Sequence, residues 1–74
     1  MDAIGSTSAL RLLADPTRAR IASMILDSPD GRQLVGKMAE ALELRQPTVS
    51  HHVRTLAAEG LLLREPEGRN VWYS

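Results

Sequence analysis

One continuous stretch of the chain decides its fold, and it reads Gln46-Pro47-Thr48-Val49-Ser50-His51-His52-Val53-Arg54-Thr55-Leu56. Val49, Val53 and Leu56 recur at i, i+4 and i+7, so they share one apolar face of a helix. Successive side chains of a helix are about 100° apart around its axis, so some residues point away from the apolar face. In this stretch the residues that point away are polar: Ser50, His51 and Arg54. The stretch is therefore predicted to form an amphipathic helix with one buried side and one exposed side.

Three segments before this helix also show helical spacing. Asp15-Pro16 marks a helix start, because Asp15 can accept backbone N–H bonds as an N-cap and Pro16 fits the first helical position. The expected apolar positions of the three helices are Leu10 and Leu13; Ile21, Met24 and Ile25; and Leu34, Met38, Ala41 and Leu42. Leu12 gives the first helix a second apolar face, which is typical of a helix with two neighbours. The predicted helix ends lie near Ala14, before Ser28-Pro29-Asp30-Gly31, at Glu43-Leu44-Arg45-Gln46 and, for the fourth helix, at Gly60.

The C-terminal segment has a different pattern. Two short runs, Leu61-Leu62-Leu63-Arg64 and Val71-Trp72-Tyr73, are predicted to be strands joined by a turn over Pro66-Glu67-Gly68-Arg69. Side chains alternate along a strand, so Trp72 and Tyr73 face opposite sides, and Tyr73 is expected to pack inward with Val71. The predicted order is therefore three helices, a fourth helix and a hairpin.

The composition narrows the class of protein. The chain has 74 residues, enough for one domain with a small core, and no cysteine, which excludes disulfides, thiolate metal sites and a cysteine nucleophile. Hydrophobic residues make up 43% of the chain, too many for a disordered tail. No apolar run could span a membrane and no signal peptide is visible, so a cytoplasmic protein without a membrane partner is expected. The 9 basic and 9 acidic residues cancel, which excludes a globally basic nucleic-acid binder but not a local basic patch.

The third and fourth helices, joined by about four residues, are typical of a helix-turn-helix. In that motif the second helix enters the major groove of DNA, and its N-terminal residues meet the base edges. From Arg45 to Arg54 the sequence holds two arginines, two histidines and no acidic residue. His51 points outward with this acid-free strip, whereas His52 lies beside the apolar stripe and is expected to be a structural histidine. The fourth helix is therefore the predicted recognition helix.

The predicted DNA-binding residues fall into two groups. Specific contacts are assigned to Gln46, Thr48, Ser50, His51 and Arg54. Backbone contacts are assigned to Arg45, Arg64 and Arg69. Arg54 could grip a phosphate or reach guanine O6 and N7, and Gln46 suits adenine or a phosphate. The arginines of the hairpin could touch the flanking backbone or the minor groove.

Several short segments carry a family resemblance, and they are Leu12-Leu13-Ala14-Asp15-Pro16-Thr17-Arg18, Met38-Ala39-Glu40-Ala41-Leu42, Gln46-Pro47-Thr48-Val49-Ser50-His51-His52-Val53, Glu59-Gly60-Leu61-Leu62 and Glu67-Gly68-Arg69-Asn70-Val71-Trp72-Tyr73. Together they resemble the ArsR-type (arsenic-repressor-like) winged helix-turn-helix family over about residues 9 to 74. The resemblance implies a mainly α fold with a small β-hairpin, about four helices plus a two-stranded wing. It places one DNA-binding domain over residues 1–74, with the helix-turn-helix at about 34–59 and the wing at about 61–74. It also implies a dimeric bacterial repressor that binds double-stranded DNA at an inverted-repeat operator and releases it on sensing an inducer.

Two departures from the family concern metals and dimerisation. Leu34-Val35-Gly36 stands where metal-sensing members carry Cys-Val-Cys, and neither leucine nor glycine can ligate a metal, so no metal or cofactor is expected. The helix that usually forms the dimer interface in the family would follow Ser74. The chain is therefore expected to be an excised module or to dimerise another way, with the two-faced first helix as the homodimer surface.

Further departures affect the motif itself. Glu43 replaces a glycine that is common at a left-handed helix cap, which would cost about 1 kcal/mol if the same geometry is kept. Arg45 replaces a capping serine and is interpreted as trading cap stability for a phosphate contact. Glu65 and Pro66 replace residues that are often basic, and this is expected to weaken the wing as a phosphate clamp.

Two other functions stay open at this point. The fold can serve as a protein-interaction or dimerisation module without DNA binding, which the neutral charge and the acidic wing favour. The chain could also be the regulatory front end of a longer fused protein. An enzyme is not expected, because Ser50 has no positioned base and the carboxylates are scattered. The operator and the inducer stay unknown.

Overall fold

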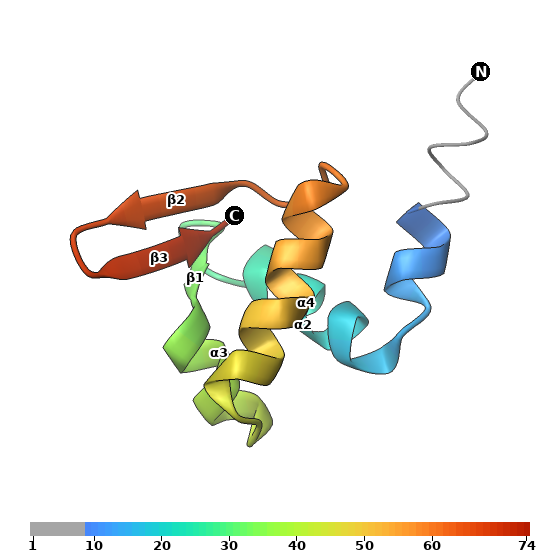
Figure 1. The fold of residues 1–74 in the computed structure, drawn as a ribbon, viewed down its shortest axis with the longest axis horizontal. Helices are drawn as coiled ribbons and strands as arrows, with labels where there is room; N and C mark the ends of the chain where they lie inside the picture. Colours follow the sequence, from blue (N-terminus) through green and yellow to red (C-terminus); the bar gives the residue numbers. More distant parts are fainter. Residues whose placement is uncertain (1–8) are drawn as a thin grey trace.

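The computed structural model describes residues 9–74, and its elements follow the predicted order (Figure 1). Residues 9–13 are helical. The elements after them are α2 (Pro16–Leu26), β1 (Gln33–Leu34), α3 (Val35–Leu42), α4 (Gln46–Ala58), β2 (Arg64–Glu67) and β3 (Asn70–Tyr73). Figure 1 shows the hairpin of β2 and β3 projecting from the helices, at the end of the molecule opposite to residues 9–13. The predicted fold class, a mainly α winged helix-turn-helix with about four helices, is confirmed.

The start of α2 is set by a local cap. The Asp15 carboxylate accepts N–H bonds from Thr17 at 2.9 Å and from Arg18 at 3.1 Å, and Pro16 opens the helix. The backbone N–H of Arg18 lowers the pKa of the Asp15 carboxyl below its ordinary value of 3.8. The predicted N-cap is therefore confirmed, and it fixes where the chain turns from residues 9–13 into α2.

One apolar core joins the helices to the hairpin. Its fully buried side chains come from the predicted stripes and are Ile21, Met38, Val49, Val53 and Leu56. Tyr73 is also buried, and Val71 packs against the same core, as predicted. The prediction that Ala41 lies in the apolar face of α3 is wrong, because Ala41 is exposed. Val35 and Ala39 are buried instead. Leu34 belongs to β1, so α3 begins at Val35. The buried face of α3 therefore holds the residues at i, i+3, i+4 and i+7 counted from Val35, which are Val35, Met38, Ala39 and Leu42.

The sheet differs from the predicted two-stranded wing. It has three antiparallel strands in the order β1-β3-β2, because Leu34 pairs with Trp72 and Gln33 pairs with Tyr73. The prediction missed β1, since a strand of two residues has no alternation that periodicity could detect. This short strand ties the hairpin to the start of α3.

The predicted start of the first hairpin strand at Leu61 is wrong, because the strand begins at Arg64. The Leu61 N–H instead returns to the Leu56 carbonyl at 2.9 Å and so helps to close α4. Gly60 permits this return, since its φ of 80° lies in the left-handed region that glycine adopts without strain.

The predicted turn over residues 66–69 is also too long. The chain reverses at Gly68 and Arg69, and Pro66 lies within β2, where it pairs with Val71. β2 is an edge strand, where the missing N–H of a proline leaves no ladder bond unmade.

Candidate nucleic-acid interface

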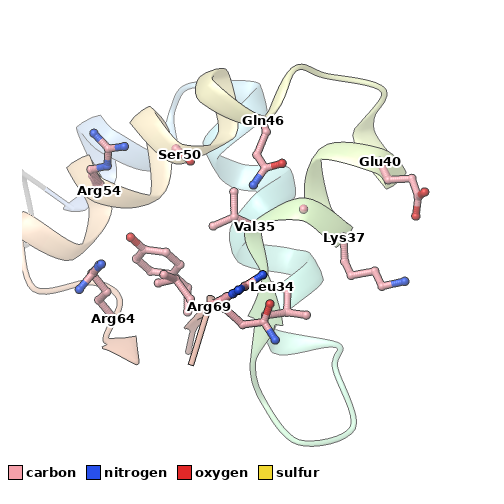
Figure 2. Close-up of a pocket in the computed structure, with 13 residues that line it drawn as sticks. Leu34, Val35, Lys37, Glu40, Gln46, Ser50, Arg54, Arg64 and Arg69 are labelled. Carbon is pink, nitrogen blue, oxygen red and sulfur yellow. The ribbon is translucent and has the colours of Figure 1, made fainter. Parts of the chain in front are cut away.

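A groove with a volume of about 460 Å³ opens between α3, α4 and the hairpin. Gln46, Ser50 and Arg54 lie on one face of α4, at i, i+4 and i+8, and form one wall. Arg64 comes from β2, and Figure 2 shows Arg54 and Arg64 at the same end of the groove. The other polar residues along the groove are Lys37, Glu40, Arg69 and Asn70. The groove therefore joins the predicted recognition helix to the wing.

Strand pairing directs Arg64 toward this groove. Arg64 is the partner of Tyr73 across β2 and β3, and paired residues of antiparallel strands project from the same face of the sheet. Tyr73 is only 3% exposed and lines the groove together with Val35 and Val71. Buried Tyr73 thus anchors the hairpin to the core, and its strand partner Arg64 carries a positive charge on the same face of the sheet.

The groove concentrates positive charge. Its charged lining consists of the cations Lys37, Arg54, Arg64 and Arg69 and the carboxylate Glu40. The chain as a whole has a net charge of zero, so this excess is local. Figure 2 shows Glu40 at the end of the groove away from Arg54 and Arg64. A cleft lined by one sign of charge focuses the field and attracts an oppositely charged partner, here an anion such as a phosphodiester.

The structure divides the eight predicted DNA-binding residues into two sets. Those that line the groove are Gln46, Ser50, Arg54, Arg64 and Arg69. Those outside it are exposed and belong to α4 or its N-cap: Arg45, Thr48 and His51. The Arg45 side chain makes no capping hydrogen bond and is available for another partner.

The prediction missed three polar residues of the groove, which are Lys37, Glu40 and Asn70. Lys37 belongs to α3 and Asn70 to β3, and both line the groove beside the predicted residues. Lys37 is exposed on the first helix of the motif, and its own segment carries no sign of a binding residue. Only the packing of α3 beside α4 brings it to this site.

Glu65 lies on the other face of the hairpin. Neighbouring residues of a strand point to opposite sides, so Glu65 faces away from Arg64. Its Oε2 accepts a bond from the Ser74 hydroxyl at 2.6 Å, and its Oε1 lies 3.6 Å from Arg32 Nη1. The Glu65 carboxylate is therefore paired on the face away from the groove, and its effect on the wing as a phosphate clamp stays a prediction.

The metal site of metal-sensing family members does not fit this chain. Leu34, Val35 and Gly36 offer no side-chain donor atom at the positions of the thiolates. Within residues 9–74, no three His, Cys, Asp or Glu side chains come together as a metal ion would require. In the same part of the chain, no helix combines the length and apolarity needed to cross a membrane.

Comparison with known proteins agrees with the fold. Residues 13–65 match the family described as helix-turn-helix domain. The arsenic resistance transcriptional regulator ArsR1 of Pseudomonas putida is 38% identical over 63 residues, which cover 85% of this chain and 48% of that protein. The transcriptional repressor SmtB of Mycobacterium tuberculosis is 37% identical over 73 residues, which cover 99% of this chain and 50% of that protein. The solved structure of HlyU from Vibrio cholerae superposes with a TM-score of 0.88 at 29% identity, covering all of this chain (100%) and 79% of that one.

A helix-turn-helix, a hairpin wing and a basic groove between them define the winged helix-turn-helix class, and the Pseudomonas and Mycobacterium relatives are named as transcriptional regulators. The chain belongs to the ArsR/SmtB family of helix-turn-helix regulators, so the resemblance found in its sequence is confirmed. It spans about half the length of the Pseudomonas and Mycobacterium regulators that it matches.

Proposed function

We propose that this chain is a repressor that binds an inverted-repeat operator as a homodimer. In each protomer α4 would enter the major groove, and the hairpin would lie along the flanking backbone. The observation that carries the proposal is the groove, where the cations Lys37, Arg54, Arg64 and Arg69 outnumber Glu40 in a chain without net charge. The relative SmtB is named a repressor, which supports repression over activation for this chain.

The side chains of α4 suit the reading of base edges. Arg54 presents a planar fork of donors that can bond guanine O6 and N7, and the Gln46 amide can bond adenine N6 and N7. The shorter side chains at the start and outer side of the helix are assigned to close contacts: Thr48, Ser50 and His51. The arginines assigned to phosphates are Arg45, Arg64 and Arg69. Lys37 joins this second group because it lines the same groove.

Residues 9–13 support the homodimer. Leu12 packs against the core, whereas Leu10 and Leu13 are 73% and 37% exposed. An apolar face that the rest of residues 9–74 leaves exposed is suited to burial against a second copy. A two-fold symmetric pair would present two recognition helices, as an inverted repeat requires.

Selection of bound sequences from random duplex DNA at physiological salt tests the proposal. The expected result is a palindromic site whose half-sites lie about 34 Å apart. If roughly four phosphates are neutralised per protomer, the log–log dependence of affinity on salt should have a slope of about −7 for the dimer. A slope near zero, or the absence of an enriched sequence, would contradict DNA binding.

The substitution Arg54→Ala separates this function from a protein-interaction module. We expect it to abolish specific binding while dimerisation, measured by sedimentation, stays unchanged. Arg20→Ala removes an equal charge from an exposed position of α2 outside the groove and serves as the matched control. Dimerisation of a wild-type chain that binds no duplex would favour the interaction module.

A further inference from the structure

A second cluster of charged and aromatic side chains lies on the face of the hairpin opposite the groove. The guanidinium carbon of Arg32 lies 3.9 Å from the centroid of the Trp72 ring, in a cation–π stack. Arg32 Nε donates to Asp30 Oδ2 at 3.3 Å, and Arg32 Nη1 lies 3.6 Å from Glu65 Oε1. We call these four residues the outer-face cluster: Asp30, Arg32, Glu65 and Trp72.

The outer-face cluster connects the hairpin to the loop between α2 and α3. Arg32 directly precedes β1, and Gln33 in β1 donates from Nε2 to the Ser28 hydroxyl at 2.7 Å. The Ser28 hydroxyl in turn donates to the Met24 carbonyl of α2 at 3.0 Å. Trp72 and Glu65 belong to the two hairpin strands, so one arginine links both strands to a loop that is fixed on the helices.

Arg32 adds a second link between the hairpin and the helices, beside the anchor that buried Tyr73 provides. The hairpin strands have four residues each and project from the helices, and the strand that joins them to the loop, β1, has two residues. Arg64 and Arg69 are carried by this hairpin, whereas Arg54 is carried by α4 on the other side of the groove. The angle of the hairpin therefore sets the separation of the cations across the groove.

We propose that Arg32 is a positioning residue for DNA binding: its stack on Trp72 and its ion pairs hold the hairpin so that Arg64 and Arg69 meet the backbone that Arg54 and α4 approach. The inference rests on the proposed function, because it concerns the same DNA interface. Asp30 and Glu65 offset the charge of Arg32, so this arginine acts through the position of the hairpin and not through a phosphate of its own.

The test is a double-mutant cycle on the full chain with a duplex obtained by selection. Arg32→Gln should weaken binding by about three- to thirtyfold, the range that one cation–π stack and two partly exposed ion pairs can supply. In a variant that already carries Arg64→Gln and Arg69→Gln, the same change should weaken binding by less than about twofold, since no hairpin contact is left to lose. Arg32→Lys keeps the charge for the ion pairs but loses the flat stacking group, so its loss of affinity should lie between that of the wild type and that of the glutamine variant.

A matched control and a readout without DNA complete the experiment. Arg20→Gln removes one charge from an exposed position of α2 and should leave affinity unchanged within about twofold. Trp72 is the only tryptophan of the chain, so its fluorescence and its quenching by acrylamide report the stack directly. Arg32→Gln should raise the quenching of Trp72.

The outcomes are distinguishable. An equal loss of affinity in both backgrounds would overturn the inference, because Arg32 would then contact DNA itself. Unchanged quenching of Trp72 would overturn it whatever the DNA result. A wild-type chain that binds no duplex would count against the proposed function, and in that case the quenching decides whether the outer-face cluster holds the hairpin.

Discussion

Arg18 in α2 and His52 in α4 are joined by a hydrogen bond, with Arg18 Nε donating to His52 Nδ1 at 3.2 Å. The Nη1 of the same guanidinium donates to the Leu12 carbonyl at 3.4 Å. One side chain thus ties α4 to α2 and to the helical segment of residues 9–13. His52 is therefore a structural histidine, as its position beside the apolar stripe predicts.

Removing this bond should loosen α4 without exposing the core. A double-mutant cycle of Arg18→Gln and His52→Leu should give a coupling free energy of about 0.5–1.5 kcal/mol in urea unfolding, the usual net value of a hydrogen bond. His51→Leu is the matched control, because the neighbouring histidine is exposed and should change stability by less than about 0.5 kcal/mol. A larger effect at His51 than at His52 would contradict the assignment.

The Asp15 cap predicts a pH dependence of stability. The pKa of its carboxyl is lowered by the backbone N–H of Arg18, so the charged form stabilises the folded chain above the unfolded value of 3.8. This contribution should be lost as the pH falls from 3.8 through the lower pKa of the folded state. Asp15→Asn keeps a capping oxygen but does not titrate, so its stability should approach that of the wild type as the solution is acidified. A difference in stability between the wild type and Asp15→Asn that stays constant with pH would contradict a charged cap at Asp15.

Glu43 should be a site of stored backbone strain. It closes α3 with φ of 57° and ψ of 42°, and it is the one non-glycine residue of residues 9–74 with a positive φ. Glu43→Gly should therefore raise the free energy of unfolding by about 0.5–1 kcal/mol, as measured by urea titration. Glu40→Gly makes the same chemical change inside α3 and should lower it by about 1 kcal/mol. Destabilisation by both changes would show that the left-handed cap carries no strain.

Arg45→Ser should separate stability from DNA binding. Arg45 has the extended backbone of an N-cap, with φ of −73° and ψ of 144°, but no capping side-chain bond. A serine hydroxyl there could accept an α4 N–H, which should raise the melting temperature and add about 0.5–2 kcal/mol of stability. Affinity for the operator should fall, because a phosphate contact is removed. Arg45→Ala should lose affinity without gaining stability. Tighter binding by the serine variant would contradict the hypothesis that Arg45 gives up cap stability for a phosphate contact.

Local patterns in the sequence are sufficient to predict the helices and most of the core. Asp15, Pro16 and Gly60 mark helix boundaries, and Val49, Val53 and Leu56 mark the inward face of α4, because caps and helical faces depend on residues within about four positions. The face of α4 that carries Gln46, Ser50 and Arg54 follows from the same rotation.

The contacts between distant segments follow from the packing of the elements and not from any local pattern. Lys37, Arg54 and Arg64 come from three separate elements, and no local pattern states that they share a groove. β1 exists because Leu34 pairs with Trp72 far along the sequence, and the buried face of α3 includes Val35 and Ala39 and not Ala41. The physical reason is the separation along the sequence of the residues that interact. Helix periodicity depends on residues in adjacent turns. Strand pairing, the groove and the contact of Arg32 with Trp72 depend on segments that meet only after the helices have packed.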